Sequence, residues 1–416
     1  MTGNHKLRIA LDCRSLDAKQ GIGTAVLALA NALSASDSAE QEYTFIVHQE
    51  LQDWLQPYIF GPCRLACVAA SGVSRFKKSL RPIAPLRAVL AKLRTRLRPV
   101  PVSSGYVESE AFDLVHFPTQ IAYLTRLPSI YQPWDLQHLH YPQFFSKTEF
   151  ALREKFYRAY CAQAAFVCVQ TEWTRQDVID KYGISPEKVA VIRWGSVLDA
   201  YAAASPRATR DAVEKYRLPL QFLFYPAVTW PHKNHENILR ALYILKKRGK
   251  TPQVVFTGAS TKFRATLDRL ARELGIADQL HYLGFVTPEE LLSIFAKATA
   301  MVFPSKFEGF GLPILEAFHA RVPVLSSNAT VLPEVAREGA AYFDPDSPTE
   351  LAALLVRCLD DSDFRESLIQ KGSEVLATFS MKDTAAKFQT LYARTIGRSS
   401  RENGNLSQQA SVRELA

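Results

Sequence analysis

Short apolar runs of strand length alternate with helix-length segments along most of the chain, and this alternation starts twice. The first series consists of the runs at 7–12, 43–48, 114–117, 165–169 and 189–192. After a loop-like stretch at 200–207, a second series consists of the runs at 222–225, 253–256, 280–283, 300–303 and 322–325. Strands that alternate with helices are typical of a mainly parallel sheet. We therefore predict an α/β protein with two such domains.

The length supports this division, because 416 residues exceed one ordinary domain and suggest two of about 200 residues each. We place the first domain at 1–197 and the second at 198–380. A C-terminal helix is expected at 381–396, where it could cross back to the first domain. Residues 397–416 are rich in Ser, Asn, Gln and Arg. Such a composition predicts a disordered tail.

The positive charge of the chain is concentrated in one segment. The net charge is +9, and residues 75–98 carry nine Lys or Arg and no Asp or Glu. The rest is near neutral, which argues against an extended nucleic-acid surface. Within the segment, an apolar stripe from Leu86 to Leu97 is flanked by cations, a pattern typical of a helix lying on an anionic membrane. A solvated helix packed on the first domain is the alternative.

Several features predict a cytoplasmic protein, located at the inner face of the cell membrane if the basic segment binds lipid. No apolar stretch reaches the roughly 18–20 residues of a membrane span, and the polar N-terminus has no signal-peptide pattern. The six cysteines are scattered without a CxxC pair. We interpret them as reduced, mostly buried residues.

The most informative segment joins a buried strand ending at Phe303 to a helix beginning near Leu312, with Pro313 suited to its first turn. The loop between them carries Glu308, and Glu316 follows in the helix. A helix start offers backbone N–H groups to a phosphate, and Glu316 could accept hydrogen bonds from ribose hydroxyls. Taken singly, Glu308 could be a solvated loop residue, and Glu316 could merely complement the helix dipole.

A second strand-to-helix loop, from Tyr225 to Asn237, delivers Lys233 at the start of a helix. A lysine there can neutralise the charge that develops on a departing diphosphate, without any metal. The alternative interpretation is an exposed surface lysine.

Together these segments resemble the E-x7-E signature and its context in the family 4 retaining glycosyltransferases, a resemblance that runs from about Ile9 to Ile396. It implies the GT-B fold, in which two Rossmann-like domains with mainly parallel sheets face a central cleft. It places Glu308 near the transferred sugar and Glu316 on the donor ribose. It assigns the diphosphate to the backbone amides of Gly309, Phe310, Gly311 and Leu312, with Lys233 beside them.

Two further segments resemble donor-binding parts of this family. Gly284-Phe285-Val286 resembles the segment that contacts the nucleobase, which implies Phe285 and Val286. Gly21-Ile22-Gly23 precedes a predicted helix at Thr24–Leu33 and resembles the glycine loop that faces the donor phosphates and sugar. Glycine would let backbone approach a ligand closely, although a plain turn at Gly21 and Gly23 is the alternative.

Two departures from the family pattern are visible. The segment from Pro133 resembles the His-Asp-Leu region near the sugar, but Trp134 replaces the histidine, and only Asp135 and Leu136 match. Asp135 is therefore included among the catalytic candidates, whereas we interpret the nearby His138 and His140 as non-catalytic. Many members also carry an arginine where this chain has Ala227 and Val228.

No metal and no cofactor are expected, the nucleotide-sugar being a substrate. Asp344-Pro345-Asp346 fits a metal-binding DxD pattern, but Asp346 or Ser347 would cap a helix starting at Pro348. The resemblance implies transfer of a sugar from a nucleotide-sugar donor to a glycan or lipid-linked acceptor of the cell envelope. The resemblance around Gly21 and Asp135 favours a mannosyl donor. The alternative is a catalytically weak sugar-nucleotide-binding subunit that supports a partner transferase.

Overall fold

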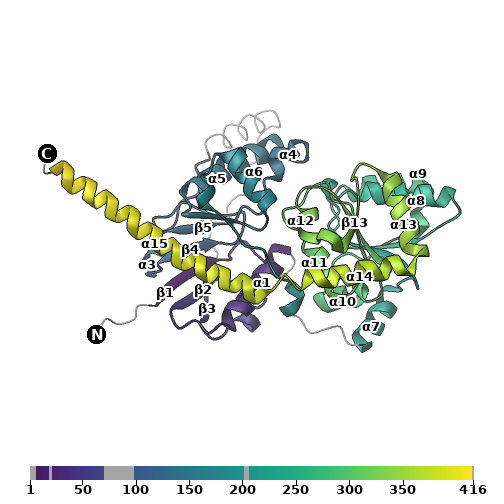
Figure 1. The fold of residues 1–416 in the computed structure, drawn as a ribbon, viewed down its shortest axis with the longest axis horizontal. Helices are drawn as coiled ribbons and strands as arrows, with labels where there is room; N and C mark the ends of the chain where they lie inside the picture. Colours follow the sequence, from purple (N-terminus) through teal and green to yellow (C-terminus); the bar gives the residue numbers. More distant parts are fainter. Residues whose placement is uncertain (1–5, 18–20, 70–97, 201–205, 415–416) are drawn as a thin grey trace, which may run out of the picture. The chain divides into compact units, whose positions relative to one another are not determined.

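The computed structural model describes residues 6–17, 21–69, 98–200 and 206–414. The chain divides into two compact units (Figure 1). One comprises Met1–Arg193 with Lys382–Ala416, and the other comprises Trp194–Met381. The second unit therefore starts at Trp194, slightly before the expected boundary at 198.

The first unit is built on a seven-stranded parallel sheet with the strand order β3-β2-β1-β4-β5-β6-β7. Its strands are β1 (Leu7–Asp12), β2 (Gln41–His48), β3 (Cys63–Val68), β4 (Leu114–Phe117), β5 (Ser129–Tyr131), β6 (Phe166–Val169) and β7 (Val189–Val191). Its helices before the C-terminal one are α1 (Gly21–Ser34), α3 (Tyr106–Ser109), α4 (Gln137–His140), α5 (Lys147–Gln163) and α6 (Glu172–Tyr182). Every residue of β4, β5 and β6 is buried, as expected for strands covered on both faces.

Two features of this unit differ from the sequence-based expectation. The predicted turn at Gly21–Gly23 is wrong, because α1 already begins at Gly21. The entropy cost of glycine destabilises mainly the middle of a helix, so glycine is tolerated in this first turn. The strands β3 and β5 were not predicted: β3 mixes exposed and buried positions, and β5 spans only Ser129–Tyr131.

The second unit contains a six-stranded parallel sheet with the order β10-β9-β8-β11-β12-β13. Its strands are β8 (Phe222–Pro226), β9 (Gln253–Thr257), β10 (Leu280–Tyr282), β11 (Ala300–Phe303), β12 (Val324–Ser327) and β13 (Ala340–Phe343). Its helices are α7 (Pro206–Tyr216), α8 (His235–Lys247), α9 (Arg264–Glu273), α10 (Pro288–Phe295), α11 (Leu312–His319), α12 (Leu332–Ala336), α13 (Pro348–Asp360) and α14 (Ser362–Leu376).

Both sheets share one doubly wound topology. In each, the first strand of the unit lies beside the fourth, β1 beside β4 and β8 beside β11. The direction of winding reverses between these neighbours, and ligands of such sheets bind at the carboxyl ends of the strands on either side of the reversal. The prediction of two Rossmann-like α/β domains is thus confirmed.

The C-terminal helix α15 (Met381–Glu414) belongs to the first unit (Figure 1). Buried polar groups hold it there: the Tyr392 hydroxyl lies 2.9 Å from His116 Nδ1, and Gln41 Nε2 donates to the Gln389 carbonyl at 3.0 Å. The expectation of disorder after Ile396 differs from the structure, in which the helix continues to Glu414. Polar composition alone does not exclude a helix that extends one already anchored by packing.

Among the residues that the structure describes, no helix is both long and apolar enough to cross a membrane. The basic segment predicted to contact lipid lies outside the described residues except for Arg98. The Arg98 guanidinium lies over the Phe156 ring, and the backbone carbonyl of Arg98 accepts a hydrogen bond from Lys155 Nζ.

Candidate functional site

The candidate site of the second unit lies at the carboxyl ends of β8 and β11, the two strands at its reversal point. These strands pair in parallel, with Ala300 opposite Leu223 and Met301 opposite Phe224. Each strand therefore delivers its following loop to the same edge of the sheet. The loop after β8 carries Lys233, and the loop after β11 carries Glu308.

Lys233 and Glu308 form an ion pair. The distance from Lys233 Nζ to Glu308 Oε1 is 2.7 Å, and the two side chains are 21% and 12% exposed. Such a charge-assisted hydrogen bond, shielded from most of the solvent, is stronger than an exposed pair. The strand order thus brings together two predicted catalytic residues that are 75 positions apart in the chain.

Hydrogen bonds beneath this pair hold the two loops together. The buried Tyr225 hydroxyl donates to the Lys233 carbonyl at 2.8 Å and lies 3.0 Å from Ser305 Oγ. Since the tyrosine proton is engaged by the carbonyl, Ser305 acts as the donor in the second contact. The Lys306 N–H also donates to the His232 carbonyl at 2.8 Å. The positions of Lys233 and Glu308 are therefore set by the protein before any ligand arrives.

Helix α11 starts directly beside this pair. Gly311 precedes it with φ 99°, and a Cβ added to Gly311 would lie 3.0 Å from Leu332 Cδ2. A residue with a side chain would be strained there in both conformation and space. Phe310 packs its buried ring against Phe379, so only its backbone can serve a ligand. In the first turn of α11, Pro313 has no N–H and the Ile314 N–H donates to the Gly311 carbonyl at 2.9 Å, so Leu312 supplies the N–H that helix geometry leaves for an anion.

Glu316 lies in the second turn of α11 and is buried. Burial raises the pKa of its carboxyl group from 4.5 to about 7. Within the described ranges of the chain, this carboxyl has no hydrogen-bond or ion-pair partner that offsets its burial. A residue that only complements the helix dipole would sit exposed in the first turn. A buried carboxyl group without a partner among the described residues is a candidate for contact with a ligand.

Phe285 and Val286 follow β10, at the same carboxyl edge of the sheet. The Phe285 side chain is 53% exposed. Because β9 separates β10 from β8, these residues lie about two strand spacings, or roughly 10 Å, from the β8 end. The loops that follow β9 and β10 are also linked, since the Gly258 N–H donates to the Gly284 carbonyl at 2.7 Å. The edge thus presents the Phe285 ring at one end, and the Lys233–Glu308 ion pair beside the start of α11 at the other.

Two family comparisons match the units that carry these residues. The glycosyl transferases group 1 family matches residues 209–375, and the glycosyl transferase 4-like domain matches residues 20–195. This chain belongs to the family 4 glycosyltransferases. The resemblance predicted from Glu308, Glu316 and Lys233 is thereby confirmed, and several relatives are named as mannosyltransferases.

Curated relatives of this glycosyltransferase include two from Escherichia coli. O-antigen chain mannosyltransferase B is 27% identical over 254 residues, which are 60% of this chain and 66% of the relative. Serotype-specific mannosyltransferase WbdA is 32% identical over 232 residues, 54% of this chain and 28% of WbdA. The match spans less than two thirds of the length of either relative.

Solved structures share the fold of the glycosyltransferase. Anabaena HepE in complex with UDP and glucose superimposes with a TM-score of 0.68 at 16% identity, covering 93% of this chain and 100% of HepE. WaaG, a glycosyltransferase involved in lipopolysaccharide biosynthesis, gives a TM-score of 0.64 at 15% identity, covering 92% of this chain and 99% of WaaG. The GT-B fold predicted for this chain is confirmed.

The predicted residues of the first unit also lie near carboxyl ends of its strands. Gly21 and Gly23 occupy the first turn of α1, the helix that follows β1. Among the described residues, no atom outside the backbone of α1 and the chain neighbours of Gly21 lies within 4 Å of a Cβ built there, so their packing does not demand glycine. Asp135 follows β5 and accepts a hydrogen bond from the Gln137 N–H at 2.9 Å, which supports the start of α4. Their contacts to a donor stay predictions.

Two features of this region were not anticipated from sequence. Trp134 adopts φ 64°, an outlier for a bulky residue, while its indole N–H donates to the Pro118 carbonyl at 2.9 Å. This bond ties the loop after β5 to the loop after β4. Asp12, the last residue of β1, forms an ion pair with Arg14, whose Nη2 lies 2.5 Å from Asp12 Oδ2. No sequence signal distinguished that pair from ordinary surface charges.

The histidines interpreted as non-catalytic have structural contacts. His138 is fully buried, 3.3 Å from Glu154 Oε2, and burial lowers its pKa. His140 Nε2 lies 2.8 Å from Asp177 Oδ1. Beside Lys233, burial followed by the lysine charge lowers the pKa of both His232 and His235 to about 3. These two rings are uncharged at neutral pH and add no positive charge to the site.

The DxD-like segment caps a helix. Ser347 Oγ accepts a hydrogen bond from the Glu350 N–H at 3.2 Å at the start of α13, with Pro348 in the first turn. Asp344 Oδ1 accepts from the Asp346 N–H at 2.7 Å. Asp346 also pairs with Lys306 at 2.5 Å. Each of these groups has a structural partner, as the capping interpretation predicts.

Proposed function

We propose that this glycosyltransferase moves a sugar, with retention of anomeric configuration, from a nucleotide diphosphate sugar to a hydroxyl group of a glycan or lipid-linked acceptor. The proposed pathway is cell-envelope polysaccharide synthesis, and the proposed sugar is mannose. The observation that carries the proposal is the Lys233–Glu308 ion pair at the reversal point, beside the open start of α11. The mannosyltransferase names of the E. coli relatives support the choice of sugar.

The donor fits the order of groups along the sheet edge. The diphosphate takes the amides of Gly309–Leu312 together with the ammonium group of Lys233, because both offer positive potential. The ribose hydroxyls donate to Glu316, whose carboxyl has no other partner in the part of the chain that the structure describes. The base lies against Phe285 and Val286, where a half-exposed aromatic ring offers a stacking surface.

The proposed reaction depends on stabilising the negative charge of the departing diphosphate. The oxygen of the acceptor hydroxyl bonds to C1 of the sugar on the face from which the C1–O bond to the diphosphate breaks. The acceptor proton passes to the departing phosphate oxygen. Lys233 and the α11 amides stabilise the charge that grows on that oxygen, and no metal takes part. Glu308 positions the sugar by accepting hydrogen bonds from its hydroxyl groups.

Donor turnover tests this proposal. With GDP-mannose and an acceptor glycan, Lys233→Ala should lower kcat about 10²–10³-fold, the size typical of losing one preorganised charge contact to a leaving group. Glu308→Gln should abolish most of the turnover of the protein. EDTA should leave the wild-type rate unchanged. Lys297→Ala and Glu273→Gln, at exposed positions of the same unit, serve as matched controls. A product with inverted configuration, seen by NMR, would contradict the mechanism.

The competing function is a sugar-nucleotide-binding subunit with little activity of its own. The observation that favours it is Trp134, which holds a strained backbone conformation where the resemblance implies a sugar-contacting histidine. Donor binding without turnover, for every acceptor offered, would establish this alternative. Turnover that disappears in Glu308→Gln while donor binding persists would exclude it.

The proposal also includes a place of action. A lipid-linked acceptor is presented at the cytoplasmic face of the membrane, and the nine cations of residues 75–98 would hold the protein there. The measurement is co-sedimentation with vesicles containing anionic lipid, and with neutral vesicles as the control. Replacing the four cations from Lys92 to Arg98 by glutamine should release the protein from anionic vesicles. Equal binding to both kinds of vesicle would refute membrane attachment through this segment.

A further inference from the structure

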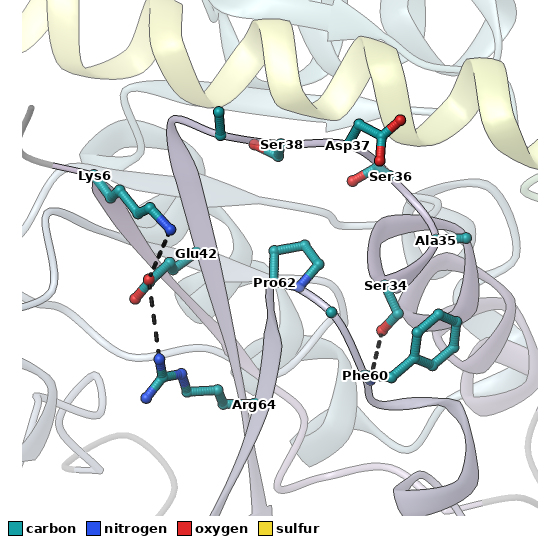
Figure 2. Close-up of a pocket in the computed structure, with 12 residues that line it drawn as sticks. Lys6, Ser34, Ala35, Ser36, Asp37, Ser38, Glu42, Phe60, Pro62 and Arg64 are labelled. Atoms are coloured by element: carbon teal, nitrogen blue, oxygen red, sulfur yellow. Dashed lines mark hydrogen bonds and ion pairs between the residues drawn. The ribbon is translucent and has the colours of Figure 1, made fainter.

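A hollow of about 700 Å³ lies at the amino ends of the strands of the first unit, the edge opposite to the one that carries Asp135. Figure 2 shows it surrounded by the turn after α1, by the starts of β2 and β3, and by Lys6 just before β1. Because successive parallel strands begin side by side, Lys6, Glu42 and Arg64 come from three neighbouring strand starts. Nothing in the proposed transfer reaction uses this edge.

The side of the hollow formed by Phe60 is rigid. The Phe60 side chain is 48% exposed. Its backbone N–H donates to Ser34 Oγ at 3.1 Å, and its carbonyl accepts from the Cys63 N–H at 3.0 Å. Gly61 has φ 55°, and a Cβ there would lie 2.5 Å from the Ser34 carbonyl oxygen. The chain therefore presents an aromatic ring to solvent from a fixed turn, which lowers the entropy cost of binding a ligand.

The charges around the hollow cancel. Glu42 Oε1 lies 3.4 Å from Lys6 Nζ and 4.0 Å from Arg64 Nη2, and Asp37 adds a second carboxylate to balance the second cation. The carboxyl end of α1, at Ser34, also points its carbonyl dipoles toward this region. A phosphorylated or otherwise anionic ligand gains nothing here. A neutral ligand rich in hydroxyl groups can donate to the carboxylates and accept from the cations.

A second hollow of about 340 Å³ lies next to the first, and Lys6 and Ala39 line both. The second hollow is bounded on its far side by Ala393 and Ile396 of α15. The turn after α1 is anchored to α15, since Gln389 Nε2 donates to Ser36 Oγ at 3.0 Å. The two hollows thus form an elongated groove, from Phe60 to α15, that suits a linear chain better than a single small molecule.

We infer that this groove, defined by Phe60, Asp37, Glu42, Lys6 and Ala39, binds a neutral oligosaccharide stretch of the glycan acceptor, away from the transfer site. The apolar face of one sugar ring stacks on Phe60, and the hydroxyls of neighbouring sugars bond the carboxylates. The inference rests on the proposed function for the identity of the glycan. Such a site would retain a growing polymer between transfers and raise its effective concentration.

The test is direct binding of α-linked mannotetraose to the full chain. Saturation-transfer NMR and calorimetry measure this binding in the absence of donor. Phe60→Ala should weaken binding at least tenfold. Ala39→Trp, which fills the junction of the two hollows at an exposed position, should do the same without deleting a contact. The matched controls are Leu51→Ala and Ala151→Trp, at exposed positions of the same unit outside the groove. Unchanged affinity in Phe60→Ala and Ala39→Trp would overturn the inference, as would tighter binding of mannose phosphate than of the neutral sugar.

The outcome separates this inference from the proposed transferase reaction. Glu308→Gln, at the transfer site, should leave tetrasaccharide binding to the groove intact. If the protein consumes donor but the Phe60 and Ala39 variants bind the glycan normally, the groove inference fails alone. If glycan binding depends on Phe60 but no donor is consumed, the groove stands and the proposed reaction fails.

Discussion

Replacing Glu316 by glutamine should stabilise the ligand-free protein at alkaline pH while weakening donor binding. In the folded protein burial raises the pKa of this carboxyl group from 4.5 to about 7. Between these two pH values the folded state keeps a proton that the unfolded chain has released, so the free energy of unfolding falls as the pH rises. At about 1.4 kcal/mol for each pH unit, the accumulated loss above pH 7 is about 3 kcal/mol.

A neutral carboxamide of the same shape avoids this loss. For a unit of this size, about 3 kcal/mol corresponds to a melting-temperature increase of about 6–12 °C at pH 8. At pH 5 the two proteins should differ by less than about 1 kcal/mol, because the wild-type carboxyl is then mostly protonated. The assay is calorimetric melting without ligand at both pH values, with the exposed Glu273→Gln as a control.

Donor affinity should move in the opposite direction, because a carboxamide accepts ribose hydroxyl protons less well than a carboxylate. The reasoning would be refuted if Glu316→Gln melted at the same temperature as the wild type at pH 8, or if its advantage were equally large at pH 5. A stabilised variant that still bound donor with full affinity would refute only the assignment of the ribose.

Three other substitutions follow from the described contacts. Gly311→Ala should lower the free energy of unfolding by about 1–3 kcal/mol, because φ is 99° and Leu332 lies 3.0 Å from the new Cβ. Urea titration measures this loss, and Gly249→Ala, with φ 78° and no described atom within 4 Å of its Cβ, should lose less. Tyr225→Phe should lower kcat more than it changes the donor KM, since it frees the Lys233 backbone while leaving the ammonium group in place; an unchanged kcat would contradict the positioning role. Tyr392→Phe should destabilise the first unit by about 1–2 kcal/mol and speed hydrogen exchange in α15, because His116 Nδ1 loses its buried partner; unaltered exchange in α15 would contradict the docking role.

The parts of the fold that could be predicted are those with strong local patterns. The mostly apolar run of β4 and the continuous apolar run of β11 identified buried parallel strands, and Gly311 with Pro313 identified a helix start. The edge strand β3 was missed because its burial alternates irregularly, and β5 was missed because Ser129–Tyr131 is too short for a periodic signal.

The candidate site could be predicted only as separate pieces. The residue types and loops of Lys233 and Glu308 were evident, but their 2.7 Å contact depends on β8 lying beside β11, and strand order is a tertiary property. The sequence also could not predict that Glu316 lacks a hydrogen-bond or ion-pair partner among the described residues. Its neighbours in space come from other segments of the chain. The left-handed conformation of Trp134 has no sequence signal at all, since bulky residues normally avoid it.

The return of α15 has a consequence for how the protein is made. Phe388 and Tyr392, near the end of the chain, pack against His116 inside the first sheet. During vectorial synthesis the amino-terminal half emerges from the ribosome without these rings, so its core stays incomplete while residues 194–381, a continuous stretch, emerge and fold. The domain that is translated first is thus completed last, and a ribosome that stalls before Phe388 releases a chain with an open core.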